Sequence, residues 1–502
     1  AESIDFLSSW AENKDENIRR FTTEATRPRG VWCKHIEALK EIAGPKGWTQ
    51  DQDIIEPHTR EPRNKYFGKT SLVLFPDTTD AVSRIVKYCN DSNLKVVPQG
   101  GNTGVVGGGV PDASGDEILI SLKRLNKLRK LNALDHAITV EAGMILSELH
   151  DLAEKGNHQF PLHIASEGSA MIGGNISTNA GGINVLRYGM MRDLVLGVEV
   201  VLPNGDIWHG LSDLKKDNTG YDLKQIFIGG EGTLGIVTAA TLKLFPIAKQ
   251  RHSAFVAVAD LNAAIKLLGH ARDISGDNLI AFEIMPRIGL DFTVKHMPGC
   301  VDPLENRYDW YILMECATSM QSDLLDLEKV MERILETGME DGLIIDGVVP
   351  KNNDEINKLW KLRSHLSEAQ THEGGSIKHD IAVSRSQIPD FLPRAIKAVE
   401  KAIPGIRPVP FGHVGDGNIH FNLSQPIGMD TAEYLNQWEN INRIVHDITA
   451  EFNGSLGAEH GIGVLKVGEL EHYKSEVELN MMRGVKTAFD PNNTFNPGRI
   501  LR

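Results

Sequence analysis

The fold is decided by a glycine-rich stretch, Pro98-Gln99-Gly100-Gly101-Asn102-Thr103-Gly104-Val105-Val106-Gly107-Gly108-Gly109, which directly follows the strand-like run Lys95-Val96-Val97. Six of the ten residues 100–109 are glycine. Without Cβ atoms the backbone can approach a ligand closely and turn its N–H groups towards phosphate oxygens. A mobile surface loop is the alternative for any glycine cluster, and the position directly after a strand weighs against it. The stretch therefore predicts a loop that binds an anionic ligand.

Two further glycine-rich segments follow in the same region. Residues 166–182 supply small residues, hydroxyls and amides without net positive charge, which suits a long, neutral-faced ligand. Residues 229–235 form the third segment, Gly-Gly-Glu-Gly-Thr-Leu-Gly. Three such loops in one domain predict an extended cofactor whose parts each need close approach of the backbone.

The third segment also matches the Gly-x-Gly-x-x-Gly fingerprint of nicotinamide sites, at Gly230 to Gly235. That fingerprint must open a helix whose N-terminus meets the pyrophosphate. Here the alternating, β-branched run Ile236–Phe245 follows instead, so we reject a Rossmann site. The P-loop pattern Gly-x-x-x-x-Gly-Lys-Ser/Thr does not occur, which excludes the common nucleotide hydrolases.

Residues 61–248 are predicted to form one α+β domain. Short β-rich runs alternate there with amphipathic segments and glycine-dense loops, and Ala81–Cys89 is the clearest helix. The expected strands are residues 72–75, 95–97, 118–122, 137–140, 195–202 and 236–245. Residues 1–60 are polar and helix-friendly, and they predict a helical preamble that packs on this domain.

A second α+β domain is predicted over residues 249–453, where glycine becomes less frequent. Strands 253–258 and 311–315 alternate with helices 262–271 and 322–335, which predicts a sheet with helices covering one face. The last segment, 454–502, begins with a glycine-punctuated turn. It continues into a helix expected at Lys474–Phe489, which ends before Asp490-Pro491.

Composition excludes several classes of protein. The 502 residues are 41% apolar and 24% charged, as in ordinary globular proteins, and the net charge of −14 disfavours non-specific binding to nucleic acid or anionic lipid. The four cysteines show no Cys-x-x-Cys spacing, which favours a reducing compartment. No apolar stretch approaches the length of a membrane span, so a soluble protein is expected.

A second chemical signature lies in the C-terminal third. His413 and His420 flank a Gly-Asp-Gly-Asn turn, in which Asp416 is expected to be a turn residue. A histidine pair alone more often serves packing, but Glu459 and His460 add an acid and a base in another glycine frame. Two imidazoles and one carboxylate suit a divalent cation of the zinc type, with a coordination position left for substrate.

The helix-like segment 359–369 places Arg363 and Ser367 four residues apart, on one face. A solvated helix face is the usual fate of such residues. The segment alone therefore leaves open whether Arg363 binds a ligand.

Together, the three glycine loops make the chain resemble the FAD-binding domain of the vanillyl-alcohol oxidase type flavoproteins. The resemblance extends over about residues 60 to 502, and within that superfamily the chain is most similar to the FAD-linked D-2-hydroxy acid dehydrogenases. Among these it is nearest to the D-2-hydroxyglutarate enzymes, with the D-lactate enzymes as close relatives. The resemblance implies a two-subdomain FAD-binding domain at 61–248 and a substrate domain at 249–453. The segment 454–502 would carry metal and base residues and return to the FAD domain.

The resemblance also implies which residues contact the cofactor. No attachment histidine is matched, so a noncovalent FAD is expected. The implied FAD-binding residues are Pro98, Gly100, Gly101, Asn102, Thr103, Gly104, Gly107, Gly168, Ser169, Gly173, Gly174, Thr178, Asn179, Gly182, Glu231, Gly235, Ile236, Val237 and Asn496.

For the chemistry, the resemblance assigns the metal ligands as His413, His420 and Glu459, with zinc favoured and manganese or cobalt as alternatives. His460 is the implied catalytic base and also contacts substrate. The implied substrate residues are Arg363, Ser367, Lys378, Asn422 and His460. Ser367 departs from the family, where threonine is more frequent. Arg363 and Lys378 suit a distal carboxylate, which D-lactate lacks, so D-2-hydroxyglutarate is the favoured substrate.

The implied reaction oxidises a D-2-hydroxy acid to the 2-oxo acid, with hydride passing to the flavin N5 and a proton to His460. D-lactate dehydrogenase, a flavin oxidase using oxygen and a non-catalytic FAD-binding subunit are the alternatives, although a subunit would not need the metal and base residues together. The expected electron acceptor is an electron-transfer flavoprotein or a quinone. The expected location is the cytoplasm or the mitochondrial matrix, with attachment to the periphery of an inner membrane as a further option. No nucleic-acid partner is expected, and a homodimer is one assembly that the sequence allows.

Overall fold

The first glycine loop leaves the end of strand β3 in a computed structural model that describes residues 32–502. This strand lies at the edge of a four-stranded sheet of order β1-β2-β4-β3, in which β2 and β3 run parallel to β4. Near-continuous apolar runs suit such parallel strands, because both faces are covered. The strands are β1 (Trp48–Thr49), β2 (Val73–Leu74), β3 (Lys95–Gln99) and β4 (Glu117–Ser121).

Helix α4 (Thr79–Asp91) packs its apolar stripe into the core of this sheet. The hydroxyl of Thr78 accepts the N–H of Ala81 and caps the helix, which extends two residues beyond the predicted helix at each end. The predicted helical preamble is only partly matched, because residues 1–31 lie outside the described residues. Residues 32–43 are helical, but β1 and the short helices α3 (Gln52–Ile55) and η1 (Glu56–Thr59) follow.

A second, antiparallel sheet completes the N-terminal half, in the order β5-β6-β10-β8-β9. Strand β10 follows Gly235 directly, which confirms that the glycine fingerprint there opens a strand and not a helix. Helices α5 (Leu146–Lys155), α6 (Ile172–Ser177) and α8 (Met191–Leu194) share its apolar core. The strands are β5 (Leu128–Asn132), β6 (Ala137–Glu141), β8 (Val195–Val201), β9 (Ile207–Gly210) and β10 (Ile236–Lys243).

The C-terminal half contains two antiparallel sheets, of order β13-β14-β12-β15 and β16-β18-β17. A bridge between Ile284 and Gly412 joins β13 to the end of β17, so the two sheets adjoin. Their strands are β12 (Gln250–Val258), β13 (Leu279–Pro286), β14 (Trp310–Thr318), β15 (Ile344–Val348), β16 (Ser376–Ala382), β17 (Arg407–Phe411) and β18 (Asn418–Ser424).

Helices cover both faces of these sheets, and the prediction of helices on one face was wrong. One apolar core packs against the first set of helices, α10 (Leu261–Ser275), α12 (Leu327–Glu340), α15 (Ile388–Ala402) and α17 (Trp438–Glu451). A separate core packs against α11 (Arg287–His296), α13 (Asn353–Ser364) and α14 (Leu366–Ala369). Helix α12 begins later than predicted, because Asp326 caps it by accepting the N–H of Lys329.

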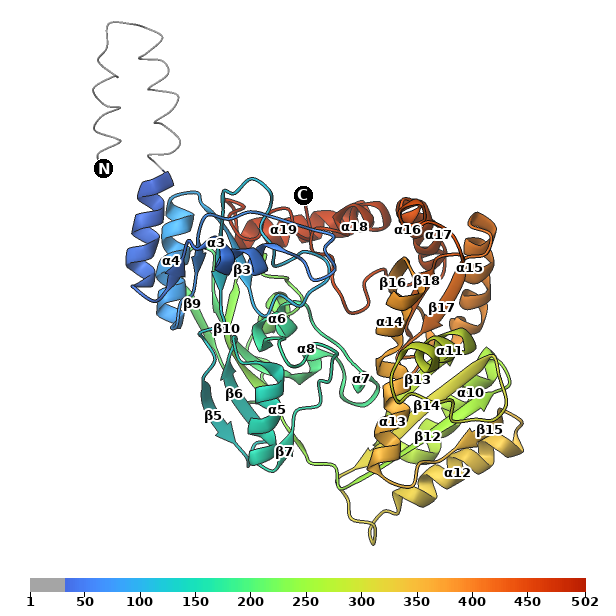
Figure 1. Cartoon of the computed structure of the whole chain (residues 1–502). Coiled ribbons are helices and arrows are strands. Elements are labelled where there is room, and N and C mark those ends of the chain that lie inside the picture. The colour runs from blue at the N-terminus through green and yellow to red at the C-terminus, as the bar shows by residue number, and fades with distance from the viewer. Residues whose placement is uncertain (1–31) are drawn as a thin grey trace, which may run out of the picture.

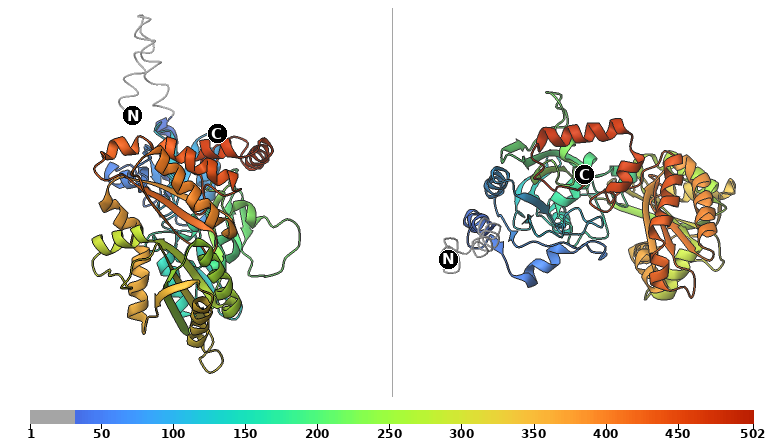
Figure 2. Two further views of the ribbon diagram at one scale, coloured as in Figure 1. Left: turned by 90° about the vertical axis from the view of Figure 1, so that its right-hand side faces the viewer. Right: turned by 90° about the horizontal axis from the view of Figure 1, so that it is seen from above.

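The last segment returns to the N-terminal half, as Figures 1 and 2 show. Helices α18 (Val467–Tyr473) and α19 (Glu476–Phe489) lead into a tail in which Phe495 bridges to Val96 of β3. Ser475 and Glu478 form a capping box at the start of α19. A second link is α7 (Val185–Tyr188), which packs on β13. The two halves are therefore linked at two separate places, by the C-terminal tail and by α7.

In the part of the chain from residue 32 onwards, no helix combines the length and apolar character that crossing a bilayer requires.

Candidate active site

A cavity of about 1020 Å³ is lined by both halves of the molecule. The N-terminal half contributes residues of its first two glycine loops, including Val106 and Gly182. The C-terminal half contributes all the predicted metal, base and substrate residues, which are Arg363, Ser367, Lys378, His413, His420, Asn422, Glu459 and His460. The structure therefore brings together residues that span about one hundred positions of sequence.

Strands β16 and β18 place four of the polar side chains on one face of their sheet. In the antiparallel register Lys378 lies opposite Asn422, and Asp380 lies opposite His420. Residues two apart on a strand share a face, so the two pairs stand side by side in the cavity. Asp380 was not predicted as a site residue, although its spacing from Lys378 was a signal available in the sequence.

The predicted metal ligands form a compact cluster. One donor atom from each of His413, His420 and Glu459 lies within 4.8 Å of the other two. His413 Nε2 is 3.4 Å from Glu459 Oε1, while its Nδ1 lies 2.6 Å from Glu283 Oε1. A metal-binding histidine usually donates one ring N–H to a carboxylate, and its other ring nitrogen faces the metal. The donor set fits a zinc-type cation.

Glu283 of β13 connects this cluster to the substrate residues. Its second oxygen lies 2.6 Å from Nε of Arg363, and its side chain is only 1% exposed. Burial alone would raise the pKa of Glu283, but His413 and Arg363 lower it to about 2. The same contact opposes the effect of burial on His413 and raises its pKa to about 9. A lone acid in the apolar strand 279–286 was the sequence signal for this residue.

The pKa of the carboxylate in this cluster, Glu459, shifts in the direction opposite to that of Glu283. Burial raises the pKa of Glu459 to about 7, against the effect of His413. A charged carboxylate in this position therefore needs a nearby positive charge, which a divalent cation supplies.

Asp380 organises the loop that carries the base. Its Oδ2 accepts the backbone N–H groups of Glu459 and His460, at 2.9 and 3.0 Å. Burial opposes its charge, but His460, Lys466 and these N–H groups hold its pKa well below the usual range. The imidazole Nδ1 of His460 lies 3.4 Å from the same carboxylate. Burial lowers the pKa of His460 to about 4, so its imidazole is neutral at neutral pH and can accept a proton.

The possibility that Arg363 lies on a solvated helix face is wrong. Its side chain is 10% exposed and packs over Phe411, 4.8 Å from the ring centre. The predicted single helix is interrupted, because α13 ends at Ser364 and α14 begins at Leu366. Ser367 lies on the second helix and still lines the cavity.

Lys378 and Asn422 differ in the hydrogen bonds that they make within the protein. The amide nitrogen of Asn422 donates to Gln370 at 2.8 Å, which fixes the orientation of its side chain. Among residues 32–502, Lys378 Nζ hydrogen-bonds only to the carbonyl oxygen of Ser367, at 3.5 Å. Partial burial, with Arg63 and Lys65 nearby, lowers the pKa of Lys378 to about 8. Its ammonium group is thus available to an anionic ligand.

Besides Arg443, which pairs with Glu469, three further cations line the cavity and were not predicted from the sequence. Arg63 and Lys65 come from the segment before β2, and Lys466 precedes α18. Lys65 Nζ stacks on the ring of Trp438, 3.6 Å from its centre. Within residues 32–502, none of these three has a carboxylate oxygen within 4.0 Å. No motif marks them, because they come together only in the folded chain.

The predicted cofactor loops also converge. A Cβ at Gly101 would clash with the carbonyl oxygen of Ser169, which brings the first loop onto the second. The Asn496 amide donates to the carbonyls of Gly108 and Glu231, at 2.9 and 2.8 Å, which joins the tail to the first and third loops. The Glu231 carboxylate accepts two N–H groups of residues 462 and 463.

Within these loops, Gly104, Gly168 and Gly174 each border open space, since a Cβ there would meet no atom of residues 32–502 within 4 Å. Such a bare cradle fits a cofactor that needs close backbone approach. Asn102 and Asn179 adopt positive φ angles, and their side chains bond within the protein, so they shape the loops. Ile236 and Val237 bury their side chains in β10, which leaves only their backbone to a ligand.

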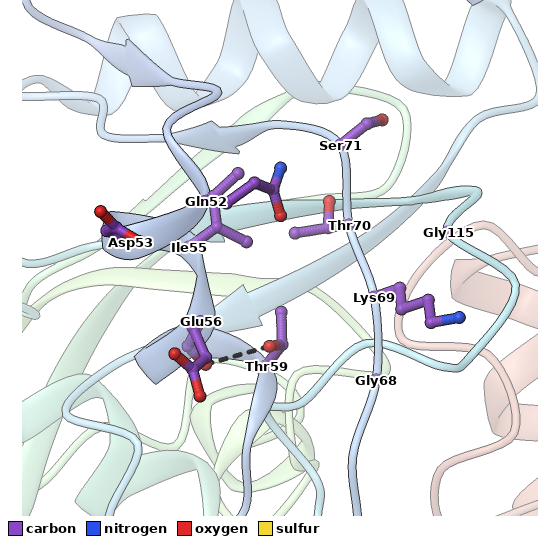
Figure 3. A pocket seen from close by; sticks show the side chains of 10 residues that line it. All are labelled: Gln52, Asp53, Ile55, Glu56, Thr59, Gly68, Lys69, Thr70, Ser71 and Gly115. Carbon is purple, nitrogen blue, oxygen red and sulfur yellow. Dashed lines mark hydrogen bonds between the residues drawn. The ribbon is translucent and has the colours of Figure 1, made fainter.

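A smaller cavity of about 510 Å³ lies beside α3 and is lined by Lys69 and Gly115, among others (Figure 3). In Figure 3 Thr59 bonds to the backbone of Glu56. None of the predicted site residues lines this smaller cavity.

Comparisons with known proteins agree with this arrangement. Residues 70–210 match a family described as an FAD binding domain, and residues 247–500 match the C-terminal domain of FAD linked oxidases. The D-2-hydroxyglutarate–pyruvate transhydrogenase of Saccharomyces cerevisiae is 38% identical, covering 90% of this chain and 91% of its own. The mitochondrial D-2-hydroxyglutarate dehydrogenase of Danio rerio is 36% identical, covering 98% and 91%.

A bacterial relative and a solved structure extend the comparison. The D-2-hydroxyglutarate dehydrogenase of Stutzerimonas stutzeri is 34% identical, covering 93% of this chain and 98% of its own. The crystal structure of p-cresol methylhydroxylase superposes with a TM-score of 0.73 over 94% of this chain and 97% of that chain, at 17% identity. The latter likeness supports the predicted fold.

Proposed function

The chain belongs to the family of FAD-linked oxidoreductases that includes the D-2-hydroxyglutarate dehydrogenases, and on that premise we propose that it oxidises D-2-hydroxyglutarate to 2-oxoglutarate. The observation that carries the substrate assignment is the set of cations in the cavity. Within the described part of the chain Lys378 has no carboxylate partner, and it lies opposite Asn422, beside the proposed metal cluster. A substrate with a second carboxylate gains a charge-assisted contact there, which D-lactate cannot make.

The chain's own residues each have a task in this reaction. Arg363 and Lys378 bind and orient the distal carboxylate. Asp380 holds the proton on Nδ1 of His460, so that Nε2 accepts the proton of the substrate hydroxyl. The helices and glycine loops around the cavity exclude water from the reacting groups.

The cofactors enter this proposal through the residues that would hold them. When bound, FAD along the three glycine loops would accept the electron pair from the substrate carbon, and a divalent cation held by His413, His420 and Glu459 would make the hydroxyl more acidic. We also propose domain boundaries at 60/61, 248/249 and 453/454. The proposed electron acceptor is an electron-transfer flavoprotein or a quinone. The proposed location is the mitochondrial matrix.

The test is a panel of D- and L-2-hydroxy acids with the FAD-loaded protein and a dye acceptor, before and after chelation. We expect turnover of D-2-hydroxyglutarate in preference to D-lactate and no turnover of the L-enantiomers. Chelation should abolish turnover and leave FAD bound, and zinc, manganese or cobalt should restore it. Preference for D-lactate would refute the substrate assignment. Full activity with an empty metal cluster would refute the role of the metal in turnover. Stoichiometric hydrogen peroxide in the absence of the dye would favour an oxidase.

A further inference from the structure

A second cluster of metal-binding side chains lies on the N-terminal half. His150 belongs to α5, while His163 and Glu167 lie in the segment between β7 (His158–Gln159) and α6. One donor atom from each of the three lies within 4.8 Å of the other two. Glu167 Oε2 is 3.2 Å from His163 Nδ1 and 4.0 Å from His150 Nδ1. These spacings resemble the 3.4 Å between His413 and Glu459 in the active-site cluster.

The surrounding contacts fix the orientation of this cluster. His150 Nε2 donates to the carbonyl oxygen of Leu162 at 2.9 Å, so that its Nδ1 is left to face Glu167. This arrangement is the one in which a metal-binding histidine is usually held. The backbone is pinned as well, because the carbonyl oxygen of Glu167 accepts the N–H of Ser147 at 3.0 Å. The loop that carries two donors is thereby tied to the helix that carries the third.

We propose that His150, His163 and Glu167 form a second binding site for a divalent cation of the zinc type, separate from the active-site cluster. Two imidazole nitrogens and one carboxylate favour zinc, cobalt or nickel over magnesium or calcium, which prefer oxygen ligands. All three side chains are partly exposed, so an ion can enter and retain water in its remaining coordination positions.

The position of the cluster gives this cation a role. His163 and Glu167 line the large cavity on the wall formed by the N-terminal half, and Glu167 directly precedes Gly168 of the second glycine loop. A bound cation would cross-link α5 to the start of this loop and hold it rigid. It would also neutralise Glu167 beside the loop that is predicted to hold the anionic cofactor. The site does not depend on the proposed reaction.

The alternative is an ion pair between His163 and Glu167 without metal, and metal stoichiometry distinguishes the two. The FAD-loaded protein is stripped with a chelator and dialysed against micromolar zinc, and bound zinc is measured by elemental mass spectrometry. We expect two equivalents per chain in the wild type and one in both His150→Ala and Glu167→Gln. The His420→Ala variant should also retain one, and the His150→Ala/His420→Ala double variant should bind none.

His209→Ala is the matched control, because this variant removes an exposed histidine paired with one carboxylate, Glu199. It should retain two equivalents. Circular dichroism and flavin content establish that each variant is folded, and Glu167→Gln keeps the shape of the side chain. The second site would be overturned if the wild type bound one equivalent of zinc and His420→Ala bound none. It would also be overturned if both His150→Ala and Glu167→Gln still bound two equivalents of zinc.

Discussion

Replacing Lys378 by methionine removes a charge from the cavity and keeps most of the side chain's length. Of the residues from 32 onwards, Lys378 Nζ hydrogen-bonds only to the carbonyl oxygen of Ser367, at 3.5 Å, so removing the ammonium group should destabilise the fold little. Burial and the neighbouring cations already disfavour its charge. We therefore expect the free energy of unfolding to change by no more than about 0.5 kcal/mol, as for a surface substitution.

Substrate recognition should respond differently. If the distal carboxylate of D-2-hydroxyglutarate binds the Lys378 ammonium, its loss should cost about 1.5 to 3 kcal/mol, which is a roughly ten- to hundredfold loss in kcat/KM. D-lactate has no distal carboxylate and should lose much less. The ratio of the two kcat/KM values, measured with a dye acceptor, is the readout that a general structural defect would not move.

The control for this prediction is His460→Ala, which removes the proposed proton acceptor and should slow both substrates alike. Equal losses for both substrates in Lys378→Met would contradict the assignment of this lysine to the distal carboxylate. A large loss of stability in the same variant would show that the ammonium group has a structural partner in the protein.

Four further predictions follow from the geometry. Because the pKa of Lys378 is lowered to about 8, its positive charge is lost as pH rises through that value. The preference for D-2-hydroxyglutarate over D-lactate in kcat/KM should therefore decline above pH 8, and a constant ratio would contradict this role of Lys378. Arg63→Gln should lower kcat/KM for D-2-hydroxyglutarate several-fold and weaken its dependence on salt, whereas Lys69→Gln, in the smaller cavity, should change neither. Glu283→Gln should weaken metal binding about 10- to 100-fold and lower the free energy of unfolding by about 3 to 5 kcal/mol in a urea titration, because it leaves a buried guanidinium unpaired. Gly174→Leu should fold, since a Cβ there has no atom of the described residues within 4 Å, but should lose flavin absorbance; a yellow variant would place the cofactor elsewhere.

Local sequence patterns predicted most of the individual elements. The helix predicted at Ala81–Cys89 and the strand after Gly235 both formed, because capping residues and β-branched runs act over a few neighbouring residues. The second helical face of the C-terminal sheets was not predicted. Which face of a strand a helix covers depends on chain connections and distant packing, and the buried strands of these sheets carry apolar residues on both faces.

The residues of the candidate site also fall into two groups, those that local sequence could predict and those that it could not. His413, His420 and Glu459 could be singled out because tight glycine turns confine them to short motifs, and the structure places their donor atoms together. Glu283 lies 130 residues from His413 in sequence yet is hydrogen-bonded to it, and Arg63 reaches the cavity from the segment before β2. The lone acid in an apolar strand marks Glu283 but does not identify its partner His413, and Arg63 has no local signature. They become visible only when strand register and the return of the C-terminal segment bring them together.

The charge balance of the cavity connects these residues to the proposed substrate. The whole chain carries a net charge of −14, so an anion must be drawn in by a local concentration of positive charge. Arg363 is already balanced by the buried carboxylate of Glu283, which also hydrogen-bonds His413 of the proposed metal cluster. Lys378 and Arg63 remain without carboxylate partners among residues 32–502. A ligand with a second negative charge, remote from the reacting hydroxyl, satisfies these cations, whereas a monocarboxylate leaves them partly buried and unpaired, at a cost in binding free energy.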